Sequence, residues 1–203
     1  MPPDFTRRSF LGLLPAAAIG LTTNLEAEGL DVRVAGESIR VTAPQLRFVT
    51  GNPLERLKNG APVPFALQLS LSTDHWASVA VRDIERFVLS YDLWEEKFSI
   101  AKMGRPRRLI SHLAAHAAES WCVGEMSLAT AGISEQQQFW VRLEARAENP
   151  AEQAELERQE SVSLARLIDM FSRRARGDQN RWAADAGPLR LIDLKKAAAE
   201  VKG

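Results

Sequence analysis

The sequence predicts a mainly β protein of the α+β class, an antiparallel β-sandwich of about seven to eight strands with two helices. Several short segments alternate apolar and polar residues, which is the period of a strand with one buried and one solvated face. Turn-forming glycine, proline and asparagine residues separate these segments. Only two stretches carry apolar residues at helical spacing. Packing the helices on one face or end of a sandwich is the simplest way to bury both patterns.

The chain begins its folded part with extended segments. Alternation at 30–33 and 38–43 predicts two strands joined by a tight turn. The chain stays extended from there to Thr50. Asn52 and Pro53 then begin a short turn or helix that ends near Leu57.

The clearest strand covers 65–72, where every second residue from Phe65 is large and apolar. This order predicts one buried and one solvated face. The same alternation predicts further strands at 79–81, 85–92, 93–100 and 138–147. The strands between residues 65 and 103 are expected to form a meander.

The first helix is predicted over 105–120, because Leu109, Leu113 and His116 fall on one side of a helix. Gly104 and Pro106 mark its beginning. The chain is expected to become extended again over 121–130.

The strongest helical pattern covers 151–175. Glutamates concentrate early and arginines late, an order that suits the helix dipole, and Gly177 ends the helix. Its apolar stripe is expected to pack on the sandwich or to bind a partner protein. The residues of this stripe are Leu164, Leu167, Ile168 and Phe171. The segment 182–194 is short and mixed, and 195–203 is predicted to be a frayed helical tail.

The N-terminus has the pattern of an export signal. Residues 6–11 are Thr-Arg-Arg-Ser-Phe-Leu and lead into an apolar stretch too short for a bilayer span of about 20 residues. They resemble the signal of the bacterial twin-arginine export pathway, with Arg7, Arg8, Phe10 and Leu11 in the motif positions. The resemblance implies contact with the twin-arginine machinery and a location in the periplasm or cell envelope. An ordinary Sec signal and an uncleaved N-terminal anchor are the alternatives.

These patterns divide the chain into four parts. They are a twin-arginine-type signal peptide at 1–27, a β-sandwich domain at 28–150, an amphipathic helix packed on the sandwich at 151–176, and a C-terminal tail at 177–203.

The motif order between residues 30 and 147 is similar to that of a known family. The motifs are the strand entry at 54–65, Trp76, the strand at 86–94 with its Leu-Ser-Tyr sequence, the helix at 109–118 and the strand at 139–143. This order resembles the exported bacterial proteins called domain of unknown function 4390. The resemblance implies an exported β-rich fold with no known activity, and it supplies no catalytic residues.

Charge and cysteine content exclude some function classes. Basic and acidic residues number 26 each, so the formal net charge is zero and we expect no nucleic-acid partner. The single cysteine, Cys122, cannot form an internal disulfide, and its apolar neighbours predict a buried, unreactive thiol. No segment after the signal is apolar enough to span a membrane.

Three residues form a candidate metal site. His112 and His116 would lie one turn apart on the predicted helix, with Glu119 three residues further on. His75 is the only other imidazole available to this site. The zinc-protease motif is absent, because Leu113 follows the first histidine where that motif has glutamate. The alternative is a helix with ordinary surface histidines. No other metal or cofactor is expected.

Other residue groups allow further interpretations. The basic clusters at 105–108 and 173–176 are either solvated helix ends or sites for phosphate or lipid head groups. The five tryptophans are either core residues or an aromatic platform for carbohydrate. Sequence signatures of serine hydrolases, P-loops and dinucleotide sites are absent, which argues against an enzyme but leaves open an active site whose residues are distant in the sequence.

The sequence leaves three hypotheses of function. The first is an exported, non-enzymatic binding or accessory protein of the envelope. The second is a metal-binding protein or metal-dependent enzyme that uses His112 and His116. The third is a carrier of lipid or another small ligand, which needs an apolar cavity between the sheets.

Overall fold

The computed structural model describes residues 29–149, 168, 171 and 180–200. These residues form two antiparallel sheets, one of six strands in the order β6-β5-β4-β3-β8-β9 and one of three strands in the order β1-β2-β7. The described strands are β1 (Asp31–Ala35), β2 (Ser38–Thr42), β3 (Val63–Ser72), β4 (Val81–Asp92), β5 (Lys97–Lys102), β6 (Arg108–Leu113), β7 (Ser127–Ala129), β8 (Phe139–Ala147) and β9 (Arg181–Leu189). The described helices are α1 (Gly51–Lys58), α2 (Ala115–Gly124) and α5 (Leu191–Glu200). The predicted mainly antiparallel, sandwich-like α+β class is therefore confirmed.

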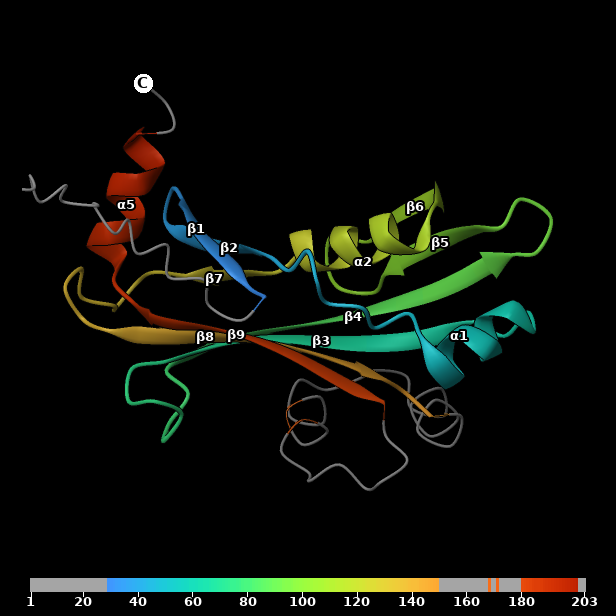
Figure 1. Cartoon of the computed structure of the whole chain (residues 1–203), viewed down its shortest axis with the longest axis horizontal. Helices are drawn as coiled ribbons and strands as arrows, with labels where there is room; N and C mark the ends of the chain where they lie inside the picture. The colour runs from blue at the N-terminus through green and yellow to red at the C-terminus, as the bar shows by residue number, and fades with distance from the viewer. Residues whose placement is uncertain (1–28, 150–167, 169–170, 172–179, 201–203) are drawn as a thin grey trace, which may run out of the picture.

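The core lies between the six-stranded sheet and the elements that cover one of its faces. The small sheet and α2 lie over this inner face, while α1 packs beside β3 and β4 (Figure 1). Alternate residues of β3, β4 and β8 point into this layer, and the large rings of Phe65, Phe87 and Phe139 are fully buried there. Burying this apolar surface is the main source of the fold's stability.

The predicted N-terminal elements are confirmed. β1 and β2 form a hairpin whose turn contains Gly36 at a φ of +62°, a conformation that glycine adopts without strain. The predicted short helix is α1. The segment between β2 and α1 forms no strand, and its Phe48 and Val49 amides are bound by a side chain of α2 instead.

The prediction of a solvated face on β3 is wrong. Gln68, Ser70 and Ser72 point away from the core but are buried. The reason is that β3 lies at the centre of the sheet, between β4 and β8. Two of these side chains bond to β8: Gln68 donates a hydrogen bond to Glu144 at 3.3 Å, and the Ser70 hydroxyl donates one to the Arg142 carbonyl at 3.4 Å.

The prediction of a helix over 105–120 is also wrong. Residues 108–113 form the edge strand β6, and helix α2 begins only at Ala115 and runs to Gly124, through the segment expected to be extended. The apolar stripe that predicted the helix combines Leu109 and Leu113 of β6 with His116 of α2. Leu109 is 77% exposed, so it does not belong to a buried helix face. Pairing with β5 outweighed the local periodicity.

The C-terminal part of the chain completes the sheet. The segment predicted to be short and mixed contains β9, which pairs with β8 and forms one edge of the six-stranded sheet. Helix α5 begins in the same segment, at Leu191, and runs to Glu200 within the predicted helical tail at 195–203; it packs against β1. The globular fold therefore extends well beyond residue 177, the boundary that the sequence indicated.

Two expected segments lie outside the described residues. The export signal at 1–27, including Arg7 and Arg8, is one of them. Most of the predicted helix at 151–175 is the other, although Ile168 and Phe171 are described and helical. Among the described residues, no helix has the length and apolarity needed to cross a membrane.

Cys122 is buried in α2. Burial raises the pKa of its thiol far above the ordinary value, and the nearby carboxylates of Glu119 and Glu125 raise it further. A thiol that is neither accessible nor ionised is a poor nucleophile, so the structure supports the structural interpretation of this cysteine.

Candidate binding site at the β3–β4 loop

The residues of the expected metal site do not form one. His112 lies on β6 and His116 on α2, so they are not one turn apart on a helix. His112 Nε2 lies 3.0 Å from Glu95, and the Glu119 carboxylate is buried and accepts the amides of Phe48 and Val49. Across the described part of the chain, no three His, Cys, Asp or Glu side chains gather closely enough to hold a metal ion.

The predicted partner-binding stripe is described at two of its four positions. Leu164 and Leu167 lie outside the described residues, and Ile168 is half-buried. Phe171 is 6% exposed, and the guanidinium of Arg181 lies 5.8 Å from its ring centroid. Because its ring packs on this chain's own β9, Phe171 offers no open surface to a partner.

Aromatic and charged side chains instead gather on the outer face of the six-stranded sheet, opposite the face that the small sheet and α2 cover. They lie where β3 ends, β8 begins and β9 ends, below the end of the sheet near α5 (Figure 1). The loop from β3 to β4 contributes His75 and Trp76, β8 contributes Trp140 and Arg142, and β9 contributes Asp185. We refer to these five residues as the loop site.

Asp74 holds the loop in shape. Its Oδ1 accepts hydrogen bonds from the Ser72 hydroxyl at 2.7 Å and the Ser78 amide at 2.9 Å, and its Oδ2 accepts one from the Ser78 hydroxyl at 2.7 Å. Ser72 Oγ in turn accepts the Trp76 amide at 2.9 Å. These bonds fix the path of the backbone on both sides of the loop's tip.

The tip of the loop is strained. His75 and Trp76 have φ values of +52° and +76°, in the left-handed region that side chains with a Cβ rarely adopt. Each such residue costs on the order of 1–2 kcal/mol relative to a relaxed backbone. Two in succession persist because the hydrogen bonds of Asp74 and Ser72 impose the conformation. In this conformation the His75 ring contacts Trp140 on β8, and the Trp76 ring lies against Arg142 on the same strand.

Trp76 packs on an ion pair. The Arg142 guanidinium lies 4.5 Å from the centroid of the Trp76 ring. Its Nε and Nη2 donate to the two oxygens of Asp185 at 2.6 and 2.8 Å. Hydrogen bonding to Asp185 raises the pKa of Arg142. The guanidinium is therefore held by an aromatic face and a carboxylate together.

His75 and Trp140 form the second aromatic contact. Their rings meet edge to face at a centroid distance of 5.2 Å. Gly187 on β9 approaches the Trp140 ring so closely that a Cβ at this position would lie 2.6 Å from it. His75 is exposed and makes no hydrogen bond to a described residue, while Trp76 and Trp140 are half-buried. The loop site is thus an open aromatic surface with charged groups at its side.

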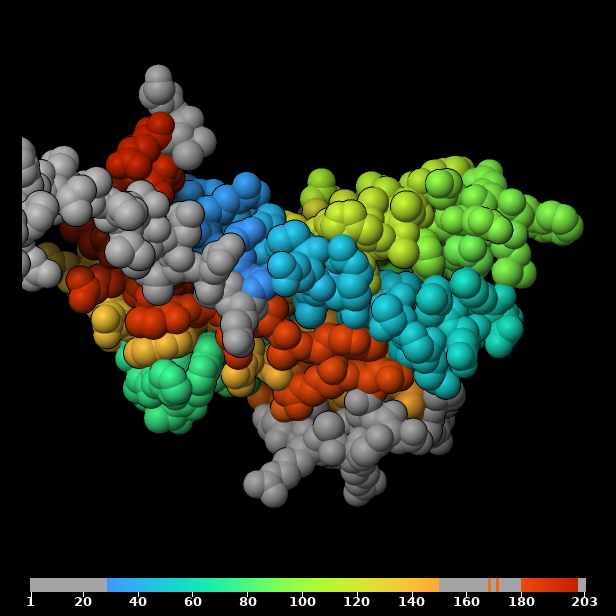
Figure 2. Space-filling model, in the orientation of Figure 1, coloured from blue at the N-terminus to red at the C-terminus, as the bar shows by residue number. Residues whose placement is uncertain are grey.

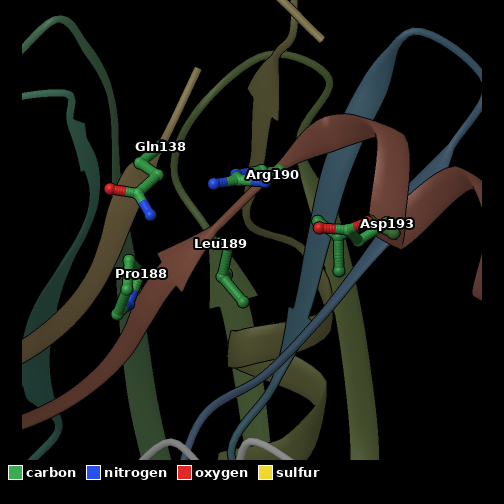
Figure 3. Close-up of a pocket in the computed structure, with 6 residues that line it drawn as sticks. Gln138, Pro188, Leu189, Arg190 and Asp193 are labelled. Carbon is green, nitrogen blue, oxygen red and sulfur yellow. The ribbon is translucent and has the colours of Figure 1, made fainter. Parts of the chain in front are cut away.

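A small pocket lies on the neighbouring corner, between the end of β9 and α5. It has a volume of about 260 Å³, and Arg190 lies between Gln138 and Asp193 in the close-up view (Figure 3). The remaining lining residues are Pro188, Leu189 and Leu194. This pocket does not lie between the two sheets, where a lipid carrier would need its cavity.

The charge of the loop site is nearly balanced. Arg142 is compensated by Asp185, and the Asp74 carboxylate is satisfied by hydroxyl and amide donors. Among the five described residues of the loop site, the one guanidinium and the one carboxylate therefore compensate each other. Aromatic rings beside paired polar groups suit a neutral ligand that has both apolar C–H surface and hydroxyl groups.

Comparison with known proteins gives no family assignment. No protein-family model matches the chain, and searches of curated proteins and of solved structures find no match.

The sequence showed only fragments of this site. The sequence presents His75 as a possible metal ligand and Trp76 and Trp140 as members of a tryptophan set, and no pattern in it links the three residues. The spacing of Ser72, Asp74 and Ser78 is a turn signal that could have indicated a braced loop. Arg142 and Asp185 come together only through the pairing of β8 with β9.

The loop site should change at very low pH. The hydrogen bonds donated by the Ser78 amide and by the Ser72 and Ser78 hydroxyls lower the pKa of Asp74 from 3.8 to about 2. A lowered folded-state pKa means that the carboxylate's stabilisation is complete above its unfolded pKa and is lost as pH falls through about 2. We expect the fluorescence of Trp76 to be constant down to pH ~4 and to shift below it. Asp74→Asn should remove this shift, and an identical low-pH shift in that variant would contradict the assignment.

Proposed function

We propose that the protein is an exported, non-enzymatic binding protein of the bacterial cell envelope, and that it binds neutral sugar chains at the loop site. The observation that carries the proposal is the pair of left-handed residues His75 and Trp76. Backbone strain that is maintained by a dedicated set of hydrogen bonds is concentrated at functional positions in proteins.

The shape and charge of the site support a sugar as ligand. A pyranose ring has an apolar C–H face that packs on aromatic rings and hydroxyl groups that pair with charged side chains. The Trp76 ring provides the first kind of contact, and Arg142 with Asp185 the second. The compensated charges favour neutral over ionic ligands.

The arrangement supports binding rather than catalysis. His75, the imidazole of the loop site, lacks a hydrogen-bonded partner among the described residues that could orient it as a base. General acid–base and nucleophilic catalysis rely on such oriented pairs. Recognition by a preorganised loop needs no such pair.

Export is proposed on the N-terminal sequence alone. Arg7, Arg8, Phe10 and Leu11 match the twin-arginine signal, and envelope polymers are rich in sugar chains that an exported protein would meet. Membership in the family called domain of unknown function 4390 is likewise a proposal that rests on the motif order between residues 30 and 147.

The experiment begins with the full chain expressed in a bacterial host and recovered from the envelope fraction. The purified protein is titrated with soluble β-1,4-linked N-acetylglucosamine oligomers while tryptophan fluorescence is recorded. We expect saturable binding that Trp76→Ala weakens at least about tenfold, since aromatic anchors dominate such contacts.

Trp94→Ala is the matched control, because Trp94 lies at the other end of β4 from the loop and is exposed. Its affinity should equal that of the wild type. Equal weakening in both variants, or no binding of any neutral oligomer by the folded protein, would refute the sugar ligand. Recovery of the chain from the cytoplasm, unaffected by Arg7→Lys with Arg8→Lys, would refute export.

A further inference from the structure

The turn between β4 and β5 exposes large apolar side chains. We call this turn, residues 92–96, the tip. Trp94 is 96% exposed and its neighbour Leu93 is 58% exposed. The turn projects from the molecule at the right of Figure 2, away from the loop site. A fully exposed tryptophan next to an exposed leucine is costly in water, and such groups mark interaction surfaces.

The tip is held rigidly although it is exposed. Asp92 Oδ1 accepts hydrogen bonds from the amides of Trp94 at 2.8 Å and Glu95 at 3.0 Å. The Glu95 carboxylate lies 3.0 Å from His112 Nε2 on β6. Because the backbone of this turn is already fixed, its conformational freedom is not lost on binding, and the turn can present Trp94 as an anchor.

The tip is acidic. Asp92, Glu95 and Glu96 are all exposed around Trp94, and the exposed Lys97 opposite Asp92 offsets one of these three charges. These carboxylates oppose insertion into an anionic lipid surface, because its head groups carry the same sign of charge. They instead fit an apolar surface that is surrounded by basic side chains.

The chain itself carries a surface of that kind. β6 is an edge strand of the six-stranded sheet, and Leu109 on it is 77% exposed. Met103, Arg105 and Arg107 are exposed in the loop that precedes β6. We call these four residues the basic edge. The basic edge combines apolar side chains with cations, and the tip combines apolar side chains with carboxylates. The two surfaces are therefore complementary in charge.

One molecule cannot bring the two surfaces together. The pairing of β5 with β6 places Phe98 beside Leu113, next to the tip, and Lys102 beside Arg108, at the opposite end. The tip and the basic edge therefore lie at opposite ends of the same hairpin. Contact between them requires a second molecule.

We propose that the acidic tryptophan tip of one molecule docks on the basic edge of a second copy of this chain. This inference is independent of the proposed sugar binding. The contact joins two different surfaces, so it is heterologous and generates a ring or an open row of molecules rather than a two-fold dimer. It should weaken as salt screens the charges.

Sedimentation velocity of the full chain over a range of concentrations tests the proposal. We expect reversible association at low salt that decreases at high salt. Trp94→Ala and Leu109→Ser should each weaken it about tenfold or more, whereas Trp76→Ala should leave it unchanged. Both altered positions are exposed, and circular dichroism confirms that each variant is folded.

A mixture of the two variants gives the decisive result. Trp94→Ala retains the basic edge and Leu109→Ser retains the tip, so the mixture should form one-to-one pairs that grow no further. A wild type that stays monomeric at all concentrations would overturn the proposal. So would a mixture that forms no pairs, or a monomer that instead binds neutral lipid vesicles through Trp94.

Discussion

Replacing Arg86 with alanine is expected to lower the free energy of unfolding by about 3–5 kcal/mol. Arg86 Nε and Nη2 each donate to one carboxylate oxygen of Glu148 at 2.8 Å, and Glu148 is 0% exposed. The substitution leaves the Glu148 carboxylate buried without its cation. The loss is large because water cannot reach the carboxylate to replace the missing partner.

Lys195→Ala is the matched control for this effect. Lys195 and Glu135 are also an ion pair, with 2.6 Å between Nζ and Oε1, but their side chains are 48% and 58% exposed. The control should cost no more than about 1 kcal/mol because solvent screens the pair. Denaturant unfolding followed by circular dichroism measures both variants. Similar losses would show that burial does not govern the Arg86–Glu148 pair.

Replacing Glu119 with alanine is expected to cost about 2–5 kcal/mol. Glu119 Oε1 accepts the amides of Phe48 and Val49, each at 2.8 Å, and fastens this segment to α2. Without the carboxylate, two backbone N–H groups remain buried with no acceptor. The segment should also detach locally, which amide hydrogen exchange at these two residues would detect.

His116→Ala is the control on the same helix, because His116 is exposed. Its expected effect on stability is within about 0.5 kcal/mol, as for ordinary surface substitutions. The comparison also tests the former metal hypothesis. If His116 and Glu119 shared a metal ion, their substitutions and a chelator would destabilise the protein alike. Equal losses in the two variants would therefore contradict the structural role assigned to Glu119.

The strands that sequence patterns predicted correctly are those with strong alternation and clear turns. The hairpin of β1 and β2, the central strand β3 and strand β8 each carry large apolar residues at every second position. The local sequence is sufficient to predict these strands, because alternation of apolar and polar residues matches the two faces of a strand and does not match the period of a helix. The short helix α1 followed from its proline and asparagine residues for the same reason.

The errors occur where partners distant in the sequence decide the structure. Residues 108–113 have the spacing of a helix but pair with β5. β9 contains Gly187 and Pro188, which are poor strand formers, yet it pairs with β8 along most of its length. The polar residues of β3 were expected in solvent because nothing local reveals the contacts that they make with β8.

The sequence by itself determined the mainly β class, most strands, the buried cysteine and the candidate export signal, because each depends on the order of neighbouring residues. The tertiary structure alone decided the loop site and the position of Glu119. Arg142 and Asp185 are 43 residues apart, and Glu119 lies 70 residues from the Val49 amide that it binds. Such contacts depend on strand register and helix packing. Both are set by the burial of apolar surface between elements that are distant in the sequence, so the pattern of neighbouring residues does not predict them.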